Sequence, residues 1–83
     1  MLNVCEVRVR GPYRLWLRFS DGAEGEIDLR DQLTGSIFQQ LRDPSTFATV
    51  RIDPEIRTIA WPNGADFAPE FLRNLLNQDG AAV

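Results

Sequence analysis

The chain has 83 residues, of which 43% are hydrophobic, so it fits one small domain with a core of its own. Its net charge is −3 and its nine basic residues, all arginine, are spread along the sequence, so the electrostatic footprint of a phosphate-backbone binder is missing. One cysteine and no histidine exclude an internal disulfide, a zinc site built by this chain and catalysis by a Ser-His or Cys-His pair.

Three stretches in the first third alternate apolar and polar residues with the period of a β-strand: 3–9, 13–19 and 23–29. In the first stretch Cys5 has the same parity as Val7 and Val9. Reactive thiols need nearby positive charge that favours the thiolate, whereas this alternation predicts a buried and unreactive thiol.

The loop between the second and third stretches sets the register of a hairpin. A two-residue Asp21-Gly22 loop would pair Phe19 with Glu24 and place carboxylates on the apolar face, which is unfavourable. A three-residue Ser20-Asp21-Gly22 loop avoids this and places Gly22 where a left-handed residue is required. We therefore predict the longer loop, with one apolar face formed by Tyr13, Leu15, Leu17, Phe19, Ala23, Ile27 and Leu29.

The later elements are shorter. Ser36 is predicted to cap a short helix over 37–42, and Asp66 to cap a final helix over 68–77 that has Pro69 in its first turn. Trp61-Pro62-Asn63-Gly64 reads as a turn. Two further strands are expected at 47–52 and 57–61. The predicted class is α+β, a small antiparallel sheet of about five strands with one short helix and one C-terminal helix.

The domain is expected to span residues 1–78, followed by a frayed tail at 79–83. Charges at Glu6, Arg8 and Arg10 interrupt the first residues where a signal peptide needs an apolar run. No apolar stretch approaches the ~18 residues that a membrane span needs. A cytoplasmic protein is therefore expected.

Trp16, between Arg14 and Arg18, is the first candidate for a contact surface. An exposed tryptophan flanked by arginines is typical of an interaction hot spot or a stacking platform. Alternatively, the C-terminal helix covers this face and Trp16 belongs to a second buried layer. The sequence leaves open which face of the sheet the helix covers.

The segment around Trp61, Asn63 and Asp66 is the second candidate. It is either a recognition loop that presents these three side chains or a connection in which Asp66 caps the helix and Trp61 and Phe67 close the core. The sequence favours the structural interpretation without deciding it.

Glu24, Glu26 and Asp28 alternate along the third strand and would share one face. Three such carboxylates are also found at divalent-cation sites. The predicted register places Arg14 and Arg18 opposite them, so a solvated, charge-paired face is favoured. No metal and no cofactor are expected.

One pattern extends over nearly the whole chain; it consists of Tyr13 to Gly22, Phe38 to Asp43, Phe47, Val50, Ile59 to Asp66, Pro69 and Glu70. With this pattern the sequence resembles an uncharacterised bacterial family, domain of unknown function family 2442. The resemblance implies a compact α+β fold and a role as one half of a two-protein module, in a gene arrangement similar to toxin and antitoxin. It implies no catalytic residue. Relatives often show a Leu-Tyr pair in the final helix, where this chain has Leu72-Arg73.

The functional hypothesis is a non-catalytic protein-interaction module, the antitoxin-like or regulatory half of a two-protein bacterial system with a small protein partner. It is not expected to bind nucleic acid directly or to contact a membrane. Two alternatives stay open: a domain that senses a small molecule in a pocket against the apolar sheet, and a homodimer that associates through an exposed strand edge. The candidate partner-binding residues are Arg14, Trp16, Arg18, Trp61, Asn63 and Asp66.

Overall fold

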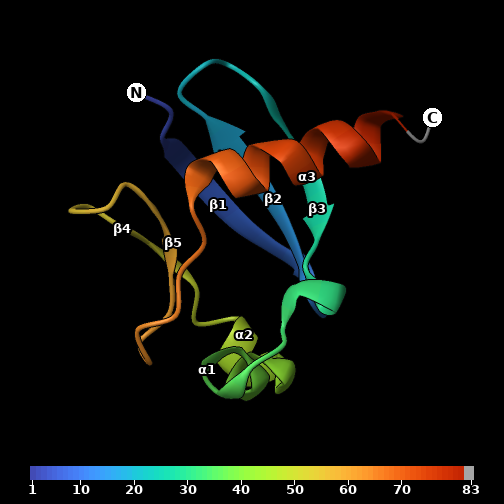
Figure 1. The fold of residues 1–83 in the computed structure, drawn as a ribbon, viewed down its shortest axis with the longest axis vertical. Coiled ribbons are helices and arrows are strands. Elements are labelled where there is room, and N and C mark those ends of the chain that lie inside the picture. Colours follow the sequence, from blue (N-terminus) through green and yellow to red (C-terminus); the bar gives the residue numbers. More distant parts are fainter. Residues whose placement is uncertain (82–83) are drawn as a thin grey trace.

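The computed structural model describes residues 1–81, with the side chains of residues 1–77. Within that range the α+β class is confirmed, but the five strands form two antiparallel sheets instead of one (Figure 1). The larger sheet has the strand order β1-β2-β3, with β1 (Val4–Gly11), β2 (Arg14–Phe19) and β3 (Glu24–Asp28). The smaller sheet pairs β4 (Arg51–Asp53) with β5 (Thr58–Ala60).

The β2–β3 hairpin has the predicted three-residue loop and register. Leu15 pairs with Ile27 and Leu17 with Gly25, and the amide of Gly22 donates to the carbonyl of Phe19 at 3.0 Å. Gly22 has φ +89°, a left-handed conformation that glycine adopts without a steric cost. The placement of carboxylates on the outer side therefore determined this register, as the sequence indicated.

Helix α3 (Pro69–Ala81) lies across the apolar face of the larger sheet (Figure 1). Leu72 is fully buried against the core. Gly25 provides the close approach, because a Cβ at this position would lie 2.5 Å from Cδ1 of Leu76. The sequence left open which face of the sheet the C-terminal helix covers. In the structure it covers the face that carries Leu15 and Leu17.

The predicted helix over 37–42 consists of α1 (Ser36–Gln39) followed by the 3-10 turn η2 (Gln40–Arg42). The prediction that Ser36 caps it is wrong, because Gly35 occupies the N-cap position with φ 87° and no side-chain cap is present. A second 3-10 turn, η1 (Arg30–Gln32), connects β3 to this region.

The predicted strand at 47–52 is wrong over its first half. Pro44 to Phe47 form helix α2, and the strand begins only at Arg51. Asp43 caps α2, its Oδ1 accepting from the amide of Ser45 at 3.3 Å, and Pro44 occupies the first turn. This local capping outweighs the β-propensity of the residues that follow.

The predictions for the C-terminal helix and the tail also differ from the structure. Asp66 does not cap α3, because the helix begins three residues later and Asp66 instead forms an isolated bridge with Ala60. The helix continues through Ala81, beyond the predicted end at residue 77. The predicted tail at 79–83 lies partly outside the described residues, at positions 82–83.

Cys5 is exposed, so the prediction of a buried thiol is wrong. A register shift between Val4 and Glu6 makes Cys5 the extra residue of a β-bulge. The bulge reverses the alternation, so Val4 pairs with Phe19 on the inner face while Val7 and Val9 keep that face further along.

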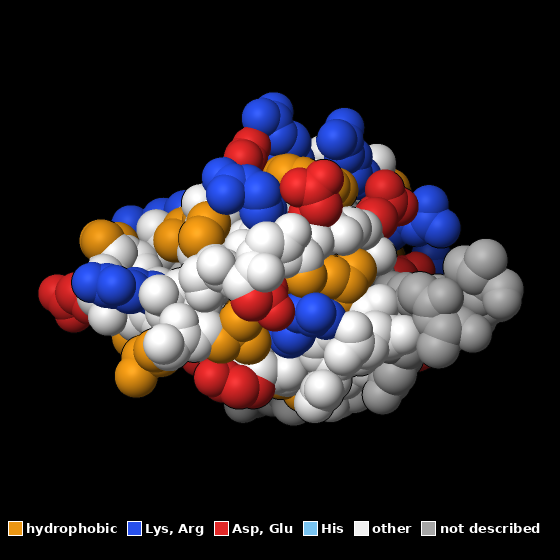
Figure 2. All heavy atoms as spheres, turned by 90° about the horizontal axis from the view of Figure 1, so that it is seen from above, with side chains coloured by type: hydrophobic (Ala, Val, Ile, Leu, Met, Phe, Trp, Pro, Cys, Tyr) orange, Lys and Arg blue, Asp and Glu red, His pale blue; other side chains and the backbone are white. Residues whose placement is uncertain are grey.

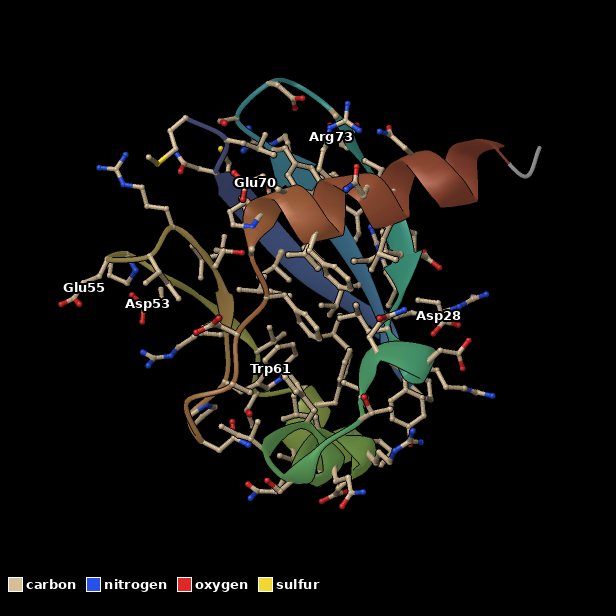
Figure 3. All side chains as sticks on the ribbon, viewed as in Figure 1. Asp28, Asp53, Glu55, Trp61, Glu70 and Arg73 are labelled. Atoms are coloured by element: carbon tan, nitrogen blue, oxygen red, sulfur yellow. The ribbon has the colours of Figure 1, made fainter. Side chains whose placement is uncertain are left out.

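The core lies between the larger sheet, α3 and the short helices. Trp61 is at its centre, 2% exposed, and its position between the sheet and helices α1 and α2 is visible in Figure 3. Thr58 is buried as well, and its hydroxyl donates to the carbonyl of Phe67 at 2.7 Å. The largest fully buried side chains are Trp61, Phe19, Phe47, Leu15, Leu17, Ile27, Leu29, Leu33, Leu41, Ile59 and Leu72.

Candidate functional site

The side of the larger sheet turned away from α3, here called the outer sheet face, carries the first candidate residues. Strand pairing aligns its side chains in three rows. The middle row places Trp16 between Arg8 and Glu26. The outer rows are Glu6, Arg18 and Glu24 on one side and Arg14 with Asp28 on the other.

Trp16 is half-buried at the centre of this face. The guanidinium of Arg8 lies 6.0 Å from the centre of its ring, at the outer limit of a cation–π contact. The neighbouring strands hold Trp16 in one position, while its free surface points away from the core. Such a restrained aromatic side chain loses little entropy on contact with a partner.

Charges on the outer sheet face are largely paired with one another. Glu6 accepts from Nε of Arg8 at 2.9 Å and from Nη2 of Arg18 at 3.3 Å, and these two arginines hold the pKa of the Glu6 carboxyl below its usual range. Arg14 lies 3.4 Å from Glu26. Figure 2 shows side chains of both signs mixed along the upper rim of the molecule.

The three carboxylates of β3, Glu24, Glu26 and Asp28, share the outer sheet face as predicted. Glu26 has an arginine partner, and Asp28 accepts a hydrogen bond from the amide of Arg30 at 2.8 Å. Among the described residues no group of three or more His, Cys, Asp or Glu side chains has the geometry to hold a metal ion.

The second group of candidates, on the Trp61-Pro62-Asn63-Gly64 turn, has a structural role. The turn is confirmed by the hydrogen bond from the amide of Gly64 to the carbonyl of Trp61 at 2.9 Å. Trp61 is withdrawn from the candidate contact residues, because its side chain is buried and its Nε1 donates to the carbonyl of Phe47 at 2.9 Å. A side chain in this position offers almost no surface to a partner.

Asn63 joins the turn to α1 and to the start of η2. Its Nδ2 donates to the carbonyl of Ile37 and to Oε1 of Gln40, both at 3.0 Å, and its Oδ1 accepts from the amide of Ala65 at 3.0 Å. Asp66 is exposed and contributes its backbone to the bridge with Ala60. The six predicted residues therefore do not form one site: Arg14, Trp16 and Arg18 share the outer sheet face, and the other three lie on this turn.

A pocket of about 410 Å³, called the cavity below, lies beside the same turn; it is open to solvent and lined largely by exposed or half-buried residues. Its lining includes three hydroxyl side chains that the sequence did not single out. The sequence did contain an indication of the helix that carries two of them, because Asp43-Pro44 is a typical helix start. The β-rich residues that follow favoured a strand instead. The lining residues are Ser45, Thr46, Thr49, Trp61, Pro62 and Asn63.

None of the helices in residues 1–81 is both long and apolar enough to pass through a membrane.

The fold is similar to that of a solved protein, the putative DNA binding protein NE0471 from Nitrosomonas europaea ATCC 19718. The TM-score is 0.85 with 23% sequence identity, and this level of identity supports a common fold alone. The match covers 98% of this chain and 52% of that protein, so the chain spans about half the length of its structural relative.

No curated protein matches the sequence. The family model of DUF2442, described as a protein of unknown function, matches residues 4–77. This match contains all five strands and most of α3, which agrees with the resemblance noted in the sequence. The chain therefore belongs to the DUF2442 family.

Proposed function

We propose that the chain is a non-catalytic protein-interaction module that binds a small protein through the outer sheet face. The observation that carries the proposal is Trp16, a half-buried aromatic side chain centred among Arg8, Arg14 and Arg18 on a sheet face turned away from α3. Tryptophan and arginine dominate interaction hot spots because they combine a large apolar area with directional polar contacts. In this proposal the partner is the second half of a two-protein bacterial system, with this chain as the antitoxin-like or regulatory half.

The charge of the chain favours a basic partner over DNA. With 12 acidic and 9 basic residues it lacks the excess of cations that phosphate-backbone binding requires. On the outer sheet face, Glu6 and Glu26 already engage arginines. The DNA-binding description of the structural relative is therefore not extended to this chain on its own. The lack of a histidine supports a non-enzymatic role.

Affinity capture from the native host tests the proposal, with and without nuclease and with mass spectrometry as readout. The comparison is between the tagged wild-type chain, Trp16→Ala and the matched control Asn74→Ala, which alters an exposed side chain on α3. We expect one small protein in near-equal amount with the wild type and the control, resistant to nuclease, and at least about tenfold less with Trp16→Ala.

Two outcomes contradict the proposal. Equal recovery with Trp16→Ala would move the contact away from the outer sheet face, and loss of the partner on nuclease treatment would point to nucleic acid. Circular dichroism of each variant checks that a loss of binding is not a loss of folding.

A second candidate function, small-molecule sensing, is favoured by the cavity of about 410 Å³ beside the Trp61 turn. Sites for small molecules have volumes of roughly 300–1,000 Å³, so this cavity is of a suitable size. It lies beside the turn and helix α2, and not against the apolar sheet where the sequence analysis expected a pocket.

A further inference from the structure

The hydroxyl groups that line the cavity beside the Trp61 turn use their hydrogen-bond donors within the protein. Ser45 and Thr46 donate their hydroxyl protons to the Asp43 carboxylate, at 3.0 and 3.1 Å, and Thr49 donates to the carbonyl of Thr46 at 2.6 Å. Carboxylate and carbonyl oxygens only accept hydrogen bonds, so these three hydroxyl protons are committed to the protein. The lone pairs of the hydroxyl oxygens remain available.

The other polar side chains of the cavity are also used as donors within the protein. Both Nδ2 protons of Asn63 have acceptors, Ile37 and Gln40, and Nε1 of Trp61 donates to Phe47. The side chains that line the cavity thus offer acceptors to a ligand and no free donor. A carboxylate or phosphate ligand would find no side-chain donor here.

The charge next to the cavity also favours a ligand that donates hydrogen bonds. The hydroxyls of Ser45 and Thr46 stabilise the ionised form of the Asp43 carboxylate, so an exposed negative charge lies within hydrogen-bond distance of two of the lining residues. This charge favours a cationic donor over an anion. Trp61 and Pro62 supply the apolar part of the lining.

From this geometry we infer that the cavity binds a small amine, with the ammonium group donating to the hydroxyl oxygens of Ser45, Thr46 and Thr49 and an apolar body against Pro62. The inference rests on the second candidate function, ligand sensing, and names its ligand class. It is independent of the protein contact proposed for the outer sheet face.

Backbone-amide NMR titration tests it with three probes that share a phenyl ring: 2-phenylethylamine, 3-phenylpropionate and acetophenone, which has an acceptor but no donor. We expect 2-phenylethylamine to shift the amides of residues 45–49 and 61–64 and to bind about tenfold more tightly than acetophenone, as one charge-assisted hydrogen bond provides. Binding of 3-phenylpropionate is expected to be weaker still.

Thr49→Val removes one acceptor with little change of shape, and should weaken 2-phenylethylamine binding several-fold without affecting acetophenone. Thr34→Val, at an exposed threonine outside the cavity, is the matched control. If Thr49→Val does not fold, Ser45→Ala replaces it.

The possible failures are distinguishable. Equal affinity for all three probes would overturn the amine inference while leaving a ligand site in place. An absence of shifts at residues 45–49 and 61–64 with every probe would overturn the ligand-sensing candidate as well.

Discussion

At the scale of single residues, the structure separates side chains that hold the fold from those that face outward. Trp61 and Asn63 belong to the first group because their polar atoms are engaged by Phe47, Ile37, Gln40 and Ala65. Trp16 belongs to the second group, since its neighbours on the outer sheet face restrain it without covering it completely. Residue type alone does not distinguish two tryptophans in such different surroundings.

Asn63→Ala is predicted to destabilise the protein by about 1–3 kcal/mol, because it removes the two hydrogen bonds that join the turn to Ile37 and Gln40 and leaves the amide of Ala65 without its acceptor. Urea denaturation measures the change. Asn74→Ala, on the exposed side of α3, should leave the midpoint nearly unchanged or raise it slightly, since alanine is the better helix former. An unchanged midpoint for Asn63→Ala would show that these hydrogen bonds contribute little to the stability of the fold.

At the scale of elements, the main contact is the packing of α3 on the larger sheet. Two contacts fix it at separate points: Leu76 fits over Gly25, and Arg73 reaches the hairpin loop to pair with Asp21 at 3.1 Å (Figure 3). Arg73 also lies 5.9 Å from the ring centre of Phe19. Arg73 thus links α3 to the hairpin loop and to the core beneath it.

Gly25→Ala is predicted to destabilise the protein by about 1–3 kcal/mol, because Gly25 has φ +159°, which residues with a Cβ rarely adopt, and because the new methyl group would overlap Leu76. Combining it with Leu76→Ala should cost less than the sum of the two single changes, since the second substitution removes the overlap. Urea midpoints of the four proteins form the double-mutant cycle. Strictly additive effects would show that the helix and strand do not share this contact.

At the scale of the whole molecule, acid should destabilise the fold through three carboxylates. Hydrogen bonds from Arg8 to Glu6, from the amide of Ala23 to Asp21 and from Ser45 to Asp43 are the largest causes of their lowered pKa values. A lowered pKa in the folded state means that the contribution to stability is complete above the ordinary values, 4.5 for Glu6 and 3.8 for the aspartates, and is lost as the pH falls through the lowered ones.

Asp43→Asn is accordingly predicted to reduce the loss of stability on acidification, because the variant has one fewer carboxylate to protonate. Urea midpoints between about pH 7 and about pH 2 measure this slope. Asp31→Asn removes an equal charge from η1 and provides the control. A slope for Asp43→Asn as steep as that of the wild type would show that the capping contacts do not persist in solution.

The sequence by itself determined the class of the fold, the strands of the larger sheet and the register of their hairpin. It did so because alternation and turn residues act over a few positions, and because a shifted register would have placed Glu24 against the core. It also indicated Trp16, Arg14 and Arg18 as one surface, which follows directly from that register.

Only the tertiary structure decided the rest. The bulge at Cys5 changes the parity of a strand, and the cap at Asp43 creates α2 where the local pattern favoured a strand. The burial of Trp61 and the cavity beside it depend on segments far apart in the chain, brought together by packing. Periodicity tells which residues share a face, but which face is covered depends on long-range contacts that no local pattern contains.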